Sequence, residues 1–132
     1  LDHWREGSGK KRFPERAEAL SIVEIALSVD DAIARIEARE GRSPRLVVTS
    51  ARSGVERTSY EMAAARFVQD PRPTLILFGT GHGLSDRLLR RADTCLEPIH
   101  GPTDYNHLSV RAAAAITLDR LYGRKSPRND PI

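Results

Sequence analysis

Three glycines at every second position form the clearest candidate for ligand chemistry in this sequence. Gly79, Gly81 and Gly83 follow an apolar run and precede a short polar segment. Glycine tolerates positive φ and lets the backbone approach a ligand closely, and amides at the start of a helix can bind polar groups. The alternative is a tight turn without a ligand. The spacing is not G-x-G-x-x-G, and no Lys suits a P-loop, which weakens both nucleotide-binding interpretations.

A second stretch, residues 96–111, is more polar than a connection requires. Asp104 and Asn106 are candidates either for contacts with a ligand or for capping the helix that follows. His100 and His107 have neither Cys-x-x-Cys nor His-x-x-x-His spacing nearby, so the sequence predicts no metal site.

The elements around these two stretches must position them. These elements are short apolar runs that alternate with helical patterns. They predict an α/β fold, with a mostly parallel sheet and helices on both faces. The expected strands are residues 19–28, 45–50, 74–78 and 94–96. The expected helices begin at the capping boxes Ser28–Asp31 and Thr58–Glu61 and also cover residues 85–91 and 108–121. Since ligands bind at the carboxyl ends of parallel strands, the loops from Thr49, Gly79 and Glu97 are expected to share one site.

Length and composition favour one domain, residues 1–123, with a flexible tail over residues 124–132. The single Cys95 excludes an internal disulfide and fits a reducing cytoplasm, and no apolar run approaches the ~20 residues of a membrane span. Three of the 21 basic residues are Lys, so 21 − 3 = 18 are Arg. Arginine suits contacts with phosphates and bases, although a GC-rich genome gives the same bias. Because residues 1–5 read as the last turn of a helix, we expect a preceding segment in the natural protein.

Together, these motifs resemble the SPOUT superfamily of trefoil-knotted methyltransferases. Residues 75–121 follow that superfamily's order of strand, glycine loop, short helix, second strand and alanine-rich helix. A more specific likeness is to a bacterial group of RNA methyltransferases that use S-adenosylmethionine (SAM), which occur alone or fused behind a tRNA guanine-N1 methyltransferase. The motifs that carry this likeness are Asp2-His3-Trp4, Glu18-Ala19-Leu20, Thr49-Ser50-Ala51, Phe78-Gly79-Thr80-Gly81 and residues 104–111.

The resemblance implies a C-terminal trefoil knot that holds SAM, a homodimer formed through the long helices, and tRNA or rRNA as the substrate. It also implies a further strand and helix that this chain lacks at its start. The residues expected to bind SAM are Thr49, Ser50, Phe78, Gly79, Thr80, Gly81, Gly83, Leu96, Pro98, Ile99, Gly101, Asn106, Leu108 and Ser109.

Three residues are expected to serve catalysis. Asp104 is the expected general base. Arg52 and Arg111 are expected to hold an RNA phosphate or orient the acceptor base, and both also read as ordinary surface arginines. Thr80 and Ser109 stand where the 2′-O-ribose branch of the superfamily has Glu and Asn, which argues against that branch's mechanism and leaves the methyl acceptor open.

Two other functions compete with methyl transfer. The same departures at Thr80 and Ser109 also fit a non-catalytic accessory module that binds SAM or RNA. A nucleotide-using enzyme requires a phosphate-binding Lys, or a ribose-binding acid about twenty residues after the glycine loop. Glu97 lies near that distance, but in a loop that the knot already explains.

Overall fold

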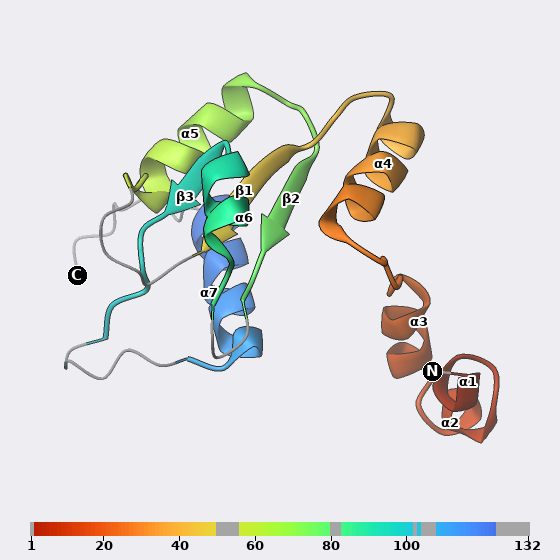
Figure 1. Ribbon diagram of the computed structural model, residues 1–132. Coiled ribbons are helices and arrows are strands. Elements are labelled where there is room, and N and C mark those ends of the chain that lie inside the picture. Colours follow the sequence, from red (N-terminus) through yellow and green to blue (C-terminus); the bar gives the residue numbers. More distant parts are fainter. Residues whose placement is uncertain (1, 50–55, 80–82, 102, 104–107, 124–132) are drawn as a thin grey trace. The chain divides into compact units, whose positions relative to one another are not determined.

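The structure is a computed structural model that describes residues 2–49, 56–79, 83–101, 103 and 108–123 (Figure 1). These residues belong to two compact units, Leu1–Ala32 and Ile33–Ile132, and each unit is described by itself. The expected tail, residues 124–132, lies outside the described residues.

Three short helices make up most of the first unit: α1 (Asp2–Arg5), α2 (Ser8–Arg12) and α3 (Pro14–Ser21). The guanidinium of Arg5 links α1 to the end of α3, because its Nε donates to the carbonyl of Leu20 at 2.9 Å and its Nη2 donates to the carbonyl of Val23. Ala17 is the buried residue of α3. Short-range packing and the two hydrogen bonds of Arg5 therefore stabilise this unit.

The strand expected over residues 19–28 is wrong. Residues 19–21 end α3, since the preceding Glu, Arg, Ala and Leu residues favour a helix. Residues 22–28 form no strand, and no described residue pairs with them as a neighbouring strand. Their large apolar side chains are exposed, from Val23 at 42% to Leu27 at 91%.

Helix α4 (Val29–Glu40) follows and begins after Ser28, as the sequence predicts. The Ser28 hydroxyl accepts a hydrogen bond from the amide of Asp31 at 3.0 Å, and the Asp31 carboxylate accepts one from the amide of Leu27 at 2.9 Å. At the other end Gly41 adopts a φ of 70°, which suits glycine, and its amide donates to the carbonyl of Glu37.

A small parallel sheet forms the centre of the second unit. Its strands are β1 (Arg45–Thr49), β2 (Thr74–Leu77) and β3 (Thr94–Leu96), in the order β2-β1-β3. Both pairings are parallel. The central strand β1 is buried on both faces. Strand β2, whose apolar sequence predicts cover on both faces, is only half-buried because it lies at the edge of the sheet.

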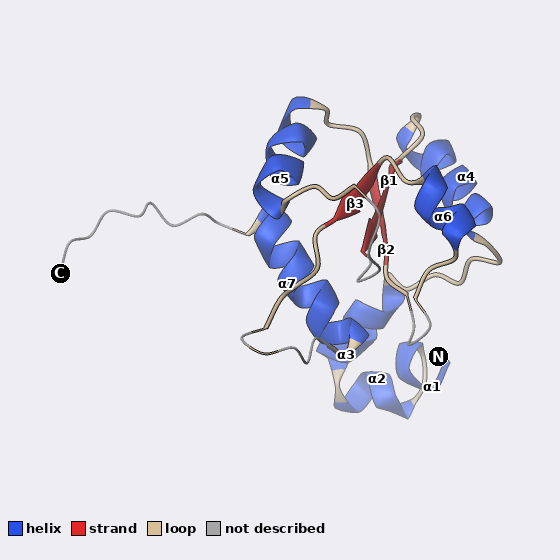
Figure 2. Ribbon diagram, turned by 60° about the vertical axis from the view of Figure 1, so that its left-hand side comes forward, coloured by secondary structure: helices blue, strands red, loops and turns tan. Residues whose placement is uncertain are grey.

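Three helices flank this sheet: α5 (Tyr60–Gln69), α6 (Asp86–Arg91) and α7 (Val110–Tyr122). In Figure 2, α5 and α7 lie on one face of the sheet and α6 lies on the other. The described part of the second unit is therefore an α/β arrangement with a parallel sheet, as predicted. The crossing that would define a knot involves residues outside the described ranges.

Each of these three helices begins at a serine. The hydroxyls of Ser59, Ser85 and Ser109 accept hydrogen bonds from the amides three residues later. The expectation that Thr58 caps α5 is therefore wrong by one residue. Ser109 also takes the capping role that the sequence left open to Asp104 and Asn106.

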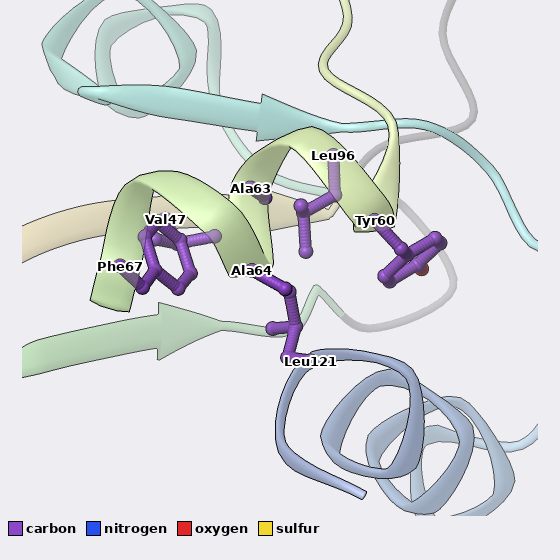
Figure 3. Close-up of a cluster of buried hydrophobic side chains, with 7 residues drawn as sticks. All are labelled: Val47, Tyr60, Ala63, Ala64, Phe67, Leu96 and Leu121. Atoms are coloured by element: carbon purple, nitrogen blue, oxygen red, sulfur yellow. The ribbon is translucent and has the colours of Figure 1, made fainter. Parts of the chain in front are cut away.

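The core lies between α5, α7 and the sheet (Figure 3). The Tyr60 hydroxyl lies 3.5 Å from the Thr117 hydroxyl, which links α5 to α7 inside this core. Ile76 and Ile99 pack against its margin. The buried cluster consists of Val47, Tyr60, Ala63, Ala64, Phe67, Leu96 and Leu121.

A buried arginine, Arg45, lies at the amino edge of the sheet. The Arg45 guanidinium lies 4.4 Å from the centre of the Phe67 ring, and its Nη2 donates to the carbonyls of Asp70 and Arg72. The Asp70 carboxylate lies 3.8 Å from Arg45 Nη2 and accepts a hydrogen bond from Arg72 Nε at 2.7 Å. This cluster fixes the end of α5 to the start of β1 and β2.

We expect the Asp70 carboxylate to make stability depend on pH below about pH 5. The hydrogen bond from Arg72 lowers the pKa of Asp70 below its usual value. Because the folded pKa is the lower one, this contribution is fully present above the unfolded pKa and is lost as the pH falls through the folded pKa. The Asp70 side chain is 46% exposed, so Asp70→Asn should reduce the difference in urea midpoint between pH 7 and pH 3 by only about 0.1–0.5 M.

Urea unfolding followed by circular dichroism at both pH values measures this difference. Glu37→Gln on the exposed surface of α4 removes one carboxylate elsewhere and serves as the control. An unchanged pH dependence in Asp70→Asn, with a reduced one in Glu37→Gln, would contradict the assignment.

Candidate cofactor site at the carboxyl edge of the sheet

The parallel register brings three strand ends to one edge of the sheet. Val48 pairs with Leu77, and Thr49 pairs with Leu96. The Thr49 hydroxyl donates to the carbonyl of Leu77 at 3.2 Å and so ties the end of β1 to the end of β2. The loops that begin after Thr49, Leu77 and Leu96 therefore start side by side, as the sequence predicts.

The glycine loop after β2 folds back on itself. A Cβ atom added to Gly79 would lie 2.7 Å from the carbonyl carbon of Gly83 and 3.0 Å from the amide nitrogen of Leu84, closer than real Cβ contacts allow. Gly83 adopts a φ of 75°, a conformation that favours glycine. Two of the three glycines are thus required by the local backbone, while Thr80 and Gly81 lie outside the described residues.

Main-chain hydrogen bonds join the start of the loop after β3 to the segment that precedes α5. The amide of Thr58 donates to the carbonyl of Cys95 at 2.8 Å, and the amide of Glu97 donates to the carbonyl of Thr58 at 3.0 Å. Leu96 has no exposed surface, and its side chain packs in the core. Further along, Pro98 and Ile99 are half-buried, whereas Gly101 is exposed.

The start of α7 contributes the remaining described candidates. Leu108 is 46% exposed and Arg111 is exposed, so both side chains are accessible in this unit. The Ser109 hydroxyl accepts a hydrogen bond from the amide of Ala112 at 3.2 Å, which gives that side chain a structural role. Phe78 is half-buried directly after β2.

Comparison with known proteins assigns the chain to a family. The profile of a family described as SAM-dependent RNA methyltransferase matches residues 1–123. The chain belongs to this family. Its membership confirms the resemblance predicted from the sequence, and it implies SAM as the methyl donor.

Three relatives of this chain are longer than the chain itself. The chain is 42% identical over 94% of its length to an uncharacterized protein of Aquifex aeolicus, of which it spans 60%. It is 45% identical over 93% of its length to proteins named tRNA (guanine-N(1)-)-methyltransferase from Oleidesulfovibrio alaskensis and Nitratidesulfovibrio vulgaris. It spans 28% of each of those two proteins.

The described residues at the carboxyl edge have one property that suits SAM, the cofactor implied by the family. The carboxyl edge offers main-chain groups and half-buried apolar side chains, which suit an adenine and its ribose. Within the ranges that the structure covers, no group of three His, Cys, Asp or Glu side chains could hold a metal ion. The other expected site residues, Ser50, Arg52, Asp104 and Asn106, lie outside those ranges.

Sequence reasoning missed two residues at this edge. Thr58 was interpreted as a helix cap, but it pairs with Leu96 through a parallel bridge. Arg57 precedes it, and its positive charge acts on the Cys95 thiol, whose pKa is raised above the usual value mainly by burial. Only their position just before a serine-capped helix distinguishes them in the sequence, and that signal is equally typical of an ordinary loop.

Among the helices that the described residues form, none has the length and apolar character needed to cross a bilayer.

Proposed function

We propose that this chain is the SAM-binding part of an RNA methyltransferase, with SAM held at the carboxyl edge of the sheet. The observation that carries the proposal is the shared edge itself, where Thr49, Phe78–Gly79 and the loop after Leu96 begin side by side. Ligands of open parallel sheets bind at this edge. The family profile supports methyl transfer to RNA as the activity.

SAM supplies an activated methyl group, so the protein has to bind the cofactor, orient the acceptor and remove one proton. Main-chain groups near Gly79, Ile99 and Leu108 bind the cofactor in this proposal. Asp104 accepts the proton from the acceptor. Arg52 and Arg111 hold the RNA phosphate or orient the acceptor base.

Three broader features belong to the same proposal. The C-terminal segment forms a trefoil knot, two copies associate through their long helices, and the protein acts on tRNA or rRNA in the cytoplasm. Residues 1–123 form the domain and the remainder forms its tail. The likeness to proteins named as tRNA methyltransferases supports tRNA in particular.

Titration of SAM into the protein by calorimetry tests the cofactor assignment. We expect a saturable signal with a Kd between about 1 μM and 1 mM, the usual range for enzymes and their substrates. The demethylated product S-adenosylhomocysteine should compete, whereas ATP, which shares only the adenosine, should compete weakly. Absence of any binding at millimolar SAM would overturn the assignment.

A non-catalytic accessory module is the second candidate function. It is favoured by the short span of the chain on its named relatives, 28% of their length, because the rest of those proteins can carry the named activity. Incubation with labelled SAM and bulk tRNA or rRNA separates the two candidates. Transfer of label to RNA excludes the accessory module, whereas SAM binding without transfer favours it.

A further inference from the structure

We propose that the exposed surface formed by Lys10, Lys11, Arg12, Phe13 and Arg16 is a binding surface for single-stranded RNA. We call it the α2–α3 surface. This inference rests on the proposed function, because it takes the substrate to be RNA. It goes further in assigning recognition to the first unit, which contains none of the residues expected to contact SAM.

The α2–α3 surface carries a dense run of positive charge. Residues 8–16 contain four basic side chains and the carboxylate of Glu15, a balance of 4 − 1 = +3. The whole chain has a net charge of +3, so the remaining residues sum to zero. A local excess of this kind attracts phosphates.

The three consecutive cations at the end of α2 are exposed. No ion pair found within the described ranges involves Lys10, Lys11 or Arg12. Other basic side chains differ in this respect, since Arg39 pairs with Glu40 and Arg72 pairs with Asp70. The cations of α2 therefore keep their charge available to an anionic partner.

An exposed aromatic ring lies within the same surface. Phe13 is 45% exposed, and the guanidinium carbons of Arg12 and Arg16 lie 5.9 and 5.4 Å from the centre of its ring. Unpaired bases stack on aromatic rings and on guanidinium planes, and such stacking tolerates any base. The combination of phosphate-binding cations with a ring for stacking is typical of surfaces that bind single-stranded nucleic acid.

A neighbouring hollow does not share these properties. It has a volume of about 440 Å³ and includes Lys10 in its lining. Its charged side chains are Arg5, Lys10, Glu6 and Glu18, so its charges balance and it offers phosphates no net attraction. The inference is therefore restricted to the exposed α2–α3 surface.

Binding of a labelled short single-stranded RNA, measured by fluorescence anisotropy over a range of salt concentrations, tests the proposal. In the triple variant Lys10→Ala, Lys11→Ala, Arg12→Ala we expect a 10- to 100-fold loss of affinity at low salt. The slope of log affinity against log salt should flatten by about 2, because each phosphate contact contributes about 0.7 for single strands. The protein with Phe13→Ala should lose about 5- to 100-fold in affinity with the slope unchanged, because stacking releases few ions.

A matched control removes the same charge from the second unit. Arg39→Ala, Arg42→Ala and Arg66→Ala together replace three exposed arginines of α4, its C-terminal turn and α5. This control should retain the affinity and the salt slope of the unchanged protein to within about twofold. Circular dichroism and SAM calorimetry on each variant verify that folding and cofactor binding are preserved.

The outcomes separate this inference from the proposed function. If the α2 triple variant and the control lose equal affinity, the binding is a general charge effect and the α2–α3 surface is not a site. If RNA binding is unchanged in both α2–α3 variants while SAM still binds, the inference fails and the proposed function stands. If the unchanged chain binds neither SAM nor RNA, both fail.

Discussion

Replacing Asp104 with Asn is expected to lower kcat for RNA methylation by about a hundred- to ten-thousand-fold, the usual contribution of a general base. SAM affinity should change by less than about threefold, because Asn is nearly isosteric and the sulfonium cofactor is held mainly by main-chain groups in the proposal. The reason for the loss is that an amide cannot accept the proton of the methyl acceptor at neutral pH. Transfer of label from SAM to RNA measures the rate, and calorimetry measures the affinity.

The pH profile distinguishes a base from a structural carboxylate. If Asp104 takes the proton, kcat/KM falls on the acid side as this carboxylate becomes protonated, and the Asn variant lacks that fall. Asp119→Asn makes the same chemical change on the exposed last turn of α7 and should leave the rate unchanged. Equal rates in the Asp104 variant and the unchanged protein would remove Asp104 from the mechanism.

Gly79→Ala is expected to weaken SAM binding by about 5- to 150-fold. The added Cβ would lie 2.7 and 2.8 Å from backbone atoms of Gly83, so one side of the glycine loop has to move. Forcing an extra methyl group into a filled space costs about 1–3 kcal/mol, and this cost converts to the stated range of affinity at 1.4 kcal/mol per factor of ten. Calorimetry with SAM is the measurement, with urea unfolding alongside to detect a loss of stability.

Gly123→Ala provides the matched steric control. A Cβ at Gly123 would lie 2.3 Å from the carbonyl oxygen of Asp119, so the insertion is at least as severe. Gly123 lies at the far end of α7, about 20 Å along the helix from Ser109. This variant should lose stability but bind SAM normally. Normal SAM binding by Gly79→Ala would contradict the placement of the cofactor at the glycine loop.

The parts of the fold that the sequence predicts well are those set by local chemistry and by short apolar runs. Residues 45–50, 74–78 and 94–96 are short apolar runs, and each contains a strand of the parallel sheet. The helix after Ser28 follows from a local capping pattern that the structure contains in full. These signals need no knowledge of which elements meet in space.

Residues 22–28 show where that reasoning ends. Their apolar sequence indicates that burial would be favourable, but a strand also needs a hydrogen-bonded neighbour, and the identity of a neighbour is long-range information. Thr58 fails for a related reason, since its bridge to Leu96 joins residues that are 38 positions apart (96 − 58 = 38). The helices α1 and α2 are too short and polar to leave a periodic pattern.

The candidate site is only partly predictable for a chemical reason. A pocket that binds through main-chain amides and carbonyls has little requirement for particular side chains, apart from glycines such as Gly79 where the backbone comes close. The sequence could therefore locate the loops from strand ends and glycine spacing. The roles of Asp104 and Arg52 depend on where their side chains point, which no local pattern fixes.

The buried Cys95 makes this protein convenient for site-selective fluorescent labelling. It is the only cysteine in the sequence, it is buried in β3, and its raised pKa keeps the thiol protonated. Since thiol reagents attack the exposed thiolate, maleimide dyes should leave Cys95 unmodified while the protein is folded. A cysteine introduced at an exposed position would then carry a single dye in the otherwise unaltered chain, and reaction at Cys95 itself would report opening of the sheet.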